Sequence, residues 1–147
     1  MPALQFPSYD MEIKQVKDKS YVFDLLRRKF ILLTPEEWVR QHVLRYLHQE
    51  KQYPLSWMAV EYITKIHGHA YRADLVVFDR SMKPTIMVEC KASHIDIDEA
   101  TIRQIMRYNI EMQAPYLFVT NGLTHYGYQW DNTQQSYQKI EALPNNG

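Results

Sequence analysis

Three segments rich in β-branched and aromatic residues follow one another between residues 57 and 91, separated only by short turns. They are residues 57–66 (WMAVEYITKI), 70–79 (AYRADLVVFD) and 85–91 (TIMVECK). Residues of these types favour strands, and short links join antiparallel neighbours in a sheet. The sequence therefore predicts three antiparallel strands in the middle of the chain.

A helix is expected before these strands. Thr34 is a good N-cap, Pro35 suits the first helical position, and Glu37 stands where a capping box has its acid. The helix should run to about Gln49, and Pro54 prevents any continuation.

The second half of the chain predicts a helix, a strand and a hairpin. The helix should begin near Asp98, a good N-cap, and end at about Gln113. Residues 116–120 (YLFVT) form a short apolar strand, and residues 124–130 and 136–142 form two strands of a hairpin. Because a helical crossover makes strands parallel, residues 116–120 should run parallel to one of the first three strands.

The order helix, three strands, helix, strand and hairpin predicts an α/β fold, with a mixed sheet flanked by helices. Residues 1–20 contain two prolines and are expected to lie as an N-terminal arm over the domain. Residues 21–30 are expected to form a short helix or turn. Residues 21–147 would then make up a single domain.

Composition limits the functional classes. Seventeen basic side chains balance seventeen acidic ones, whereas a protein that holds nucleic acid by bulk charge carries a basic excess. The single cysteine, Cys90, excludes a disulfide framework and suits a reducing compartment. The first residues lack a signal-peptide pattern, and no apolar run approaches the ~20 residues of a membrane span. We expect a cytoplasmic protein with no membrane partner.

Asp74, Glu89 and Lys91 are the candidate site residues in the strands. Glu89 and Lys91 are two residues apart and point to the same face of their strand. Asp74 can meet Glu89 across the neighbouring strand. Buried charges need compensation, and two close carboxylates suit Mg²⁺. From spacing alone, a structural ion pair, Glu89 with Lys91 or Asp74 with Arg72, is an equal alternative.

Six motifs occur along the chain in this order: TPEEWVRQHVLRYL, YPLSWMAVE, YRADLVVFD, IMVECKA, QIMRY and LFVTNGLTHYGYQW. Together they resemble the N-terminal nuclease domain of the R (restriction) subunit of type I restriction enzymes, which belongs to the PD-(D/E)xK nuclease superfamily. The resemblance covers roughly residues 20–142, and it implies a restriction-endonuclease-like αβββαβ core.

The resemblance implies a metal-dependent deoxyribonuclease. Asp74 and Glu89 would hold Mg²⁺, with Mn²⁺ as a substitute, and the backbone carbonyl of Cys90 would complete the coordination. Lys91 would assist the attacking water. Ala73 stands where the superfamily name has proline, a position that varies within the superfamily.

The first helix should supply an auxiliary acid, for which Glu36 and Glu37 compete. At 100° per residue, Glu36 points the same way as the apolar residues Val39 and Val43, whereas Glu37 points away from them. We therefore expect Glu36 to be the auxiliary catalytic and metal-side acid. The alternative is that it only favours the positive end of the helix dipole.

Gln104 and Tyr108 form a Q-x-x-x-Y pair that resembles the motif following Glu-x-Lys in type I R subunits. Gln104 is a candidate catalytic residue, and Tyr108 a candidate DNA contact, at the border of the cleft. Arg40, Arg103 and Arg107 are candidates for phosphate binding. The alternatives are solvated helix faces and, for Arg40, an ion pair with Glu36.

The first functional hypothesis is a Mg²⁺-dependent DNA endonuclease that lacks the ATP-dependent motor. The chain has four glycines and no glycine-rich phosphate loop, so we expect no ATP site in it. DNA and other subunits of a restriction system are the expected partners. The alternatives are a non-catalytic DNA-binding or assembly module and a small α/β binding protein. His67 and His69 lack a third ligand at zinc spacing, so zinc is not expected.

Overall fold

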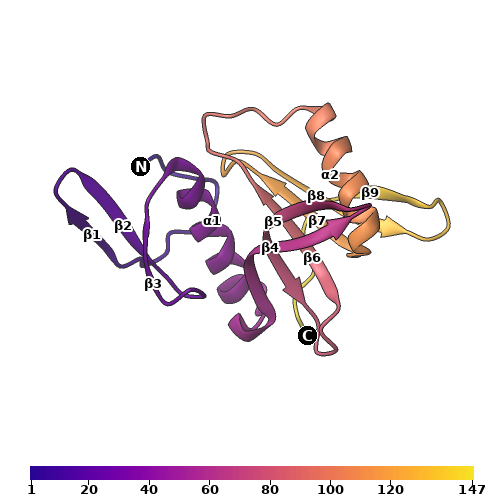
Figure 1. The fold of residues 1–147 in the computed structure, drawn as a ribbon, viewed down its shortest axis with the longest axis horizontal. Helices are drawn as coiled ribbons and strands as arrows, with labels where there is room; N and C mark the ends of the chain where they lie inside the picture. Colours follow the sequence, from indigo (N-terminus) through magenta and orange to yellow (C-terminus); the bar gives the residue numbers. More distant parts are fainter.

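The computed structural model describes residues 1–147, apart from the side chain of Ile66. It contains a small three-stranded sheet, a six-stranded sheet and two α-helices (Figure 1). In chain order, the elements are β1 (Ile13–Val16), β2 (Lys19–Asp24), β3 (Lys29–Leu32), α1 (Pro35–Arg45), η1 (Tyr46–Glu50), η2 (Leu55–Trp57), β4 (Met58–Ile66), β5 (His69–Phe78), β6 (Pro84–Cys90), α2 (Glu99–Met112), β7 (Tyr116–Thr120), β8 (His125–Asp131) and β9 (Ser136–Ile140).

The six-stranded sheet has the order β4-β5-β6-β7-β8-β9. Neighbouring strands are antiparallel, except for β6 and β7, which are parallel and are joined through α2. The predicted mixed sheet is therefore confirmed, and residues 116–120 lie in its interior. From α1 to β7, the elements follow the αβββαβ order, with the β8–β9 hairpin completing one edge.

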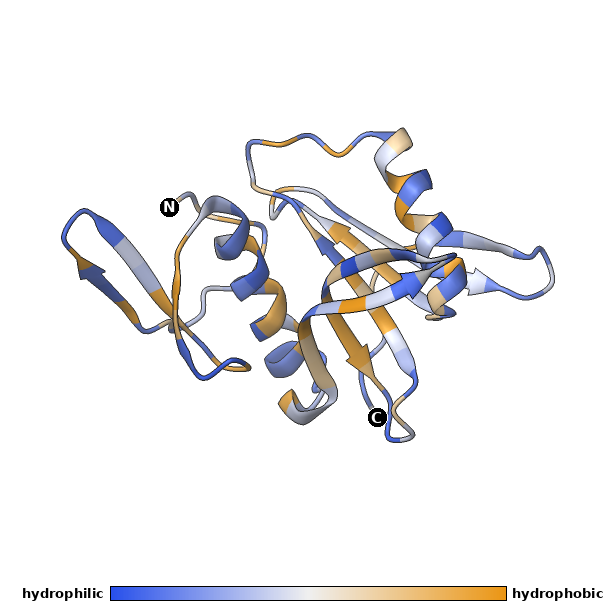
Figure 2. Cartoon of the chain, viewed as in Figure 1, coloured by the Kyte–Doolittle hydropathy of each residue, from blue (hydrophilic) through white to orange (hydrophobic). Residues whose placement is uncertain are grey.

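The two helices cover opposite faces of this sheet. Val39 and Val43 of α1 pack with Val77 and Val88, whereas Ile105 of α2 packs in a second cluster with side chains from the same strands. Alternate residues of a strand point to opposite faces, so each inner strand contributes to both cores. Hydrophobic residues recur along the inner strands of this sheet (Figure 2). None of the described helices is long and apolar enough to span a membrane.

Both helices begin at the predicted caps. The Thr34 hydroxyl accepts the Glu37 N–H at 3.1 Å, and the Asp98 carboxylate accepts the Thr101 N–H at 2.8 Å. The α1 helix continues into the π-helical turn η1, which ends close to the predicted boundary. Only half of the expected capping box forms, because the Thr34 N–H donates to the Leu32 carbonyl instead.

The N-terminal region differs from the prediction. Residues 13–32 form the antiparallel sheet β1-β2-β3, so residues 13–16 and 19–20 are strand rather than part of an arm. Of the helix or turn expected at 21–30, a turn forms at residues 25–28, and the residues on either side of it belong to β2 and β3. Residues 1–12 do lie over the domain, where the Gln5 N–H donates to the Gly122 carbonyl at 2.7 Å.

Candidate active site

The pairing register of β5 and β6 brings Asp74 and Glu89 to opposite positions on neighbouring strands. Leu75 pairs with Val88, so the next positions along the two strands are Asp74 and Glu89. Both lie at the end of a run of buried residues. The backbone therefore places these two residues next to each other, as the sequence predicts.

Glu89 carries a buried carboxylate beside Asp74. Among the described residues, its buried Oε2 atom has no hydrogen-bond partner. Burial and the negative charge of Asp74 raise the pKa of Glu89 to about 8, against the positive charge of Lys91, which lowers it. A buried carboxylate with an unpaired oxygen is costly, so this position favours a proton or a cation.

Asp74 is held in a fixed orientation by two donors. Its Oδ2 atom accepts the Cys90 N–H at 2.7 Å, and its Oδ1 atom accepts a bond from Arg40 Nη2 at 3.2 Å. The Cys90 side chain is buried in the core, as the alternation along β6 predicts. The backbone of Cys90 therefore links the two strands directly at the carboxylates.

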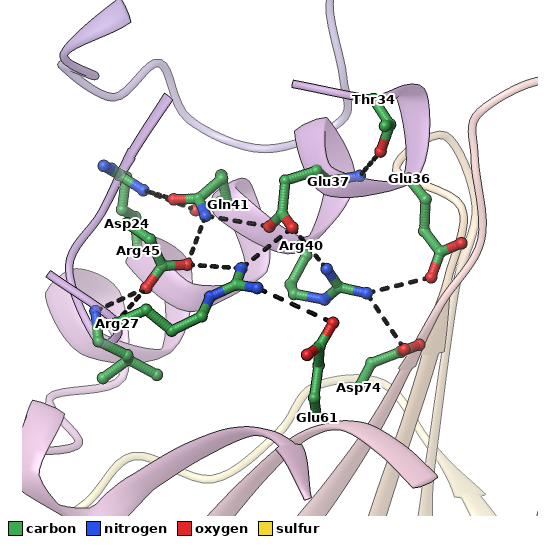
Figure 3. Close-up of polar contacts among 11 residues, drawn as sticks. Asp24, Arg27, Thr34, Glu36, Glu37, Arg40, Gln41, Arg45, Glu61 and Asp74 are labelled. Carbon is green, nitrogen blue, oxygen red and sulfur yellow. Dashed lines mark hydrogen bonds and ion pairs between the residues drawn. The ribbon is translucent and has the colours of Figure 1, made fainter. Parts of the chain in front are cut away.

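Glu36 reaches this site, but not for the reason that helical periodicity gave. Arg40 Nη2 lies 3.1 Å from the Glu36 carboxylate and also binds Asp74, so one guanidinium joins the two acids (Figure 3). Burial and the charge of Asp74 raise the pKa of Glu36, whereas Arg40 and Lys91 act against this shift. The side chain is 46% exposed, so the prediction that it points to the buried face is wrong.

Glu37, which was expected to point away, is the buried acid of α1. Its side chain is 5% exposed, and its Oε1 atom accepts bonds from Arg27 at 3.0 Å and from Arg40 at 2.7 Å. The reason is a polar layer beneath the first turns of the helix, which an apolar pattern cannot show. Arg40 itself is 7% exposed and holds Glu36, Glu37 and Asp74, so it forms the ion pair with Glu36 that was the alternative to a phosphate contact.

The polar layer continues from Glu37 to the small sheet. Asp24, at the end of β2, pairs with Arg27 at 2.9 Å and accepts a bond from Gln41 of α1 at 2.8 Å. Gln41 also donates to Glu37, and its amide oxygen accepts from Arg45 at 2.6 Å. A chain of buried polar contacts therefore joins β2 to Asp74 through α1 (Figure 3).

Lys91 directly follows β6 and is partly exposed. Its N–H donates to the Thr120 carbonyl at 2.9 Å, which extends the β6–β7 pairing by one residue. The ammonium charge opposes the raised pKa values of both Glu89 and Glu36. Lys91 is thus close enough to act electrostatically on both carboxylates.

The candidate residues on α2 divide into two groups. Gln104, Arg103 and Arg107 are exposed, and Arg103 Nη1 lies 3.6 Å from Glu99. Tyr108 is half-buried and stacks on Tyr71 of β5, with 4.2 Å between ring centroids and 15° between planes. Only Tyr108 is therefore joined by contact to the strands of the site.

Tyr71 is a site residue that the sequence analysis missed. Its hydroxyl is buried and has no hydrogen-bond partner. Burial and the negative charge of Glu89 raise the pKa of Tyr71. The signal was the position of this tyrosine three residues before Asp74, in the YRAD segment, but nothing local indicates that it meets α2.

The donor set fits a magnesium ion better than a metal bound by side chains alone. Among the described residues, no three His, Cys, Asp or Glu side chains are grouped so that they could hold a metal ion. Mg²⁺ is commonly bound through one or two carboxylates and keeps several waters. Asp74, Glu89 and the backbone carbonyl of Cys90 are the groups that could hold such an ion, and the Oε2 atom of Glu89 has no hydrogen-bond partner among the described residues.

The raised pKa of Glu89 predicts how stability depends on pH. The folded state holds the Glu89 proton up to about pH 8, whereas the unfolded chain releases it near the ordinary value of 4.5. This contribution to stability is complete below pH 4.5 and is lost as the pH rises to about 8. In EDTA, urea unfolding of the wild type should therefore show about 3 kcal/mol less stability at pH 8.5 than at pH 5, relative to Glu89→Gln. The same pH dependence in both proteins would contradict the assignment.

Comparisons with known proteins identify the family. The family model described as Type I restriction enzyme R protein N terminus (HSDR_N) matches residues 35–144. The fragment structure of a putative HsdR subunit of a type I restriction enzyme from Vibrio vulnificus YJ016 has a similar fold, with a TM-score of 0.53 and 20% identity. The similarity covers 77% of this chain and 24% of that structure. No protein with curated function matches the sequence. The chain belongs to the family of type I restriction enzyme R protein N termini.

Proposed function

We propose that this chain is a Mg²⁺-dependent DNA endonuclease of the R-subunit type, with a PD-(D/E)xK site. Family membership supports a nuclease-related role. The observation that carries the proposal is the buried Glu89 carboxylate beside Asp74, which leaves one oxygen unpaired. A divalent cation between these strands would compensate both charges.

The metal site would use Asp74, Glu89 and the backbone carbonyl of Cys90, with Glu36 as the auxiliary acid. Bound Mg²⁺ or Mn²⁺ supplies a Lewis acid, which polarises the phosphate and lowers the pKa of a water. Arg40 already restrains Asp74 and contacts Glu36. Arg40 therefore acts as a positioning residue in this proposal.

Lys91 would stabilise the negative charge that develops on the phosphate during attack, and it would orient the attacking water. Its position after β6 leaves it partly exposed while its charge acts on Glu89. Gln104, Arg103, Arg107 and Tyr108 would border the DNA from α2. DNA is the proposed substrate, and other subunits of a restriction system are the proposed partners.

One observation favours the second candidate, a non-catalytic DNA-binding or assembly module that keeps the nuclease fold. Arg40 bonds to Asp74 Oδ1, so this carboxylate has a cationic partner without any metal. In that case the site would be a structural ion-pair cluster. The two candidates differ in whether cleavage occurs.

A cleavage assay decides between them. The purified chain is incubated with supercoiled plasmid and with circular single-stranded DNA in Mg²⁺, in Mn²⁺ and in EDTA. The endonuclease proposal predicts nicked or linear products with either metal and intact DNA in EDTA. Intact DNA under every metal condition would favour the non-catalytic module.

A further inference from the structure

The sheet β1-β2-β3 lies outside the residues that the family model matches, on the far side of α1 from the six-stranded sheet (Figure 1). One of its faces is turned towards α1. Val22 is completely buried, and Asp24 accepts a bond from Gln41 of the helix. The polar contacts between Asp24, Arg27 and α1 hold the sheet against the helix.

The opposite face combines lysines with aromatic and aliphatic side chains. Directly paired residues of antiparallel strands share a face, and alternate residues change face. Lys14 Nζ lies 4.1 Å from the centroid of the Phe30 ring, and Phe23 and Phe30 meet edge to face at 5.4 Å. Val16 and Leu32 are 48% and 42% exposed. This outward face consists of Lys14, Val16, Lys19, Tyr21, Phe23, Phe30 and Leu32.

The small sheet also holds the basic charge of the chain. Residues 13–32 contain six basic and two acidic side chains, a net charge of +4, whereas the whole chain is neutral. One of the two acids, Asp24, is buried and paired with Arg27. The tip of the β1–β2 hairpin, with Lys17 and Lys19, is hydrophilic (Figure 2). The net charge of zero is therefore the sum of a basic small sheet and a more acidic remainder of the chain.

We propose that the outward face of β1-β2-β3 is a docking surface for single-stranded DNA. Lysines would contact the phosphates, and exposed parts of the aromatic rings would stack on unpaired bases. Bases of a duplex are already stacked on each other, so the aromatic side chains favour a single strand. Lysine is depleted in protein–protein interfaces, which argues against a protein as the occupant. The inference rests on the proposed function only in that DNA is the substrate.

Binding of fluorescein-labelled oligonucleotides, followed by anisotropy in EDTA, tests this surface without cleavage. The probes are a 20-nucleotide single strand and a hairpin duplex of the same sequence. The triple variant Lys14→Gln, Lys17→Gln, Lys19→Gln should bind the single strand at least about tenfold more weakly. It should also lower the slope of log K against log salt concentration by about 2. The matched control Arg80→Gln, Lys83→Gln, Lys139→Gln removes three exposed charges elsewhere and should change affinity less than about threefold.

The aromatic part is tested by Tyr21→Leu combined with Phe23→Leu, which keeps the apolar surface. Affinity for the single strand should fall about tenfold, with little change for the duplex. Three results would overturn the proposal: equal affinity of the wild type for both probes, equal losses in the two triple variants, or self-association of the wild type that the Lys14/Lys17/Lys19 variant abolishes. Light scattering measures the last of these.

The nuclease proposal and the docking proposal fail separately. Oligonucleotide binding is measured in EDTA, so it does not depend on a metal ion at the proposed nuclease site. Sheet-dependent binding without cleavage would refute only the nuclease. Cleavage by the wild type, together with equal oligonucleotide affinity of the wild type and the Lys14/Lys17/Lys19 variant, would refute only the docking surface.

Discussion

Asp74→Asn and Lys91→Ala are each expected to lower the rate of DNA cleavage by about a thousandfold. Asp74→Asn removes one of two carboxylates that would hold the metal, and Lys91→Ala removes the ammonium that would stabilise charge on the phosphate. Rates are measured on supercoiled plasmid in Mg²⁺ under single-turnover conditions. Oligonucleotide binding is measured in parallel in EDTA, so that a loss of cleavage is separated from a loss of DNA binding.

Matched substitutions at exposed positions control for this prediction. Asp10→Asn and Lys83→Ala remove the same groups at exposed positions outside the site, Lys83 in the loop between β5 and β6, and should cleave at the wild-type rate. Asp74 also accepts bonds from Cys90 and Arg40, so thermal melting must show that Asp74→Asn is folded. Cleavage within tenfold of wild type in both folded site variants would refute the assigned roles.

Glu37→Ala is expected to destabilise the protein by about 3–5 kcal/mol. Glu37 accepts bonds from Arg27, Arg40 and Gln41, and its removal leaves buried guanidinium groups without their shared acid. Glu36→Ala on the same helix should cost only about 0–1 kcal/mol, because Glu36 is half exposed. Urea unfolding at pH 7 in EDTA gives both values.

Glu36 and Glu37 are neighbouring acids on the same helix, so the two variants control for each other. If Glu37→Ala does not fold, Glu37→Gln keeps an acceptor oxygen and should fold with a smaller loss of stability. Equal losses for Glu36→Ala and Glu37→Ala would show that the polar layer does not act as described. Cleavage should show the opposite pattern: Glu36→Ala should lower the cleavage rate although it costs little stability, because Glu36 is the proposed auxiliary acid.

Local signals in the sequence predicted the six-stranded part of the fold. Thr34 with Pro35, and Asp98, are strong helix starts, and both helices begin there. The β-rich segments with short links allow few arrangements, so the antiparallel pairing of β4, β5 and β6 and the neighbouring positions of Asp74 and Glu89 followed from them. These features depend on residues that are near each other in the chain.

The errors arose where distant residues decide the structure. Helical periodicity assumes that the buried face is apolar, but α1 buries Glu37, Arg40 and Gln41 against Asp24 and Arg27. That polar layer is assembled from segments that no local pattern links. Tyr71 was missed for the same reason, because its contact with Tyr108 exists only after α2 packs on the sheet.

The small sheet was missed because its turns lack the usual residues. Lys17 and Arg28 adopt positive φ values of 58° and 54°, a region that glycine and asparagine favour. Neither residue signals a hairpin in the sequence. The strands are also short, at four to six residues, so alternation of polar and apolar residues had little length over which to show.

The shared metal site of Asp74 and Glu89 is tested most directly by Mn²⁺ binding, followed by electron paramagnetic resonance of the free ion. One bound Mn²⁺ per wild-type chain is expected, and this binding should be lost in Asp74→Asn and in Glu89→Gln. The Asp10→Asn control should bind one ion as the wild type does. No binding by the wild type at millimolar Mn²⁺, or undiminished binding by both site variants, would contradict the account.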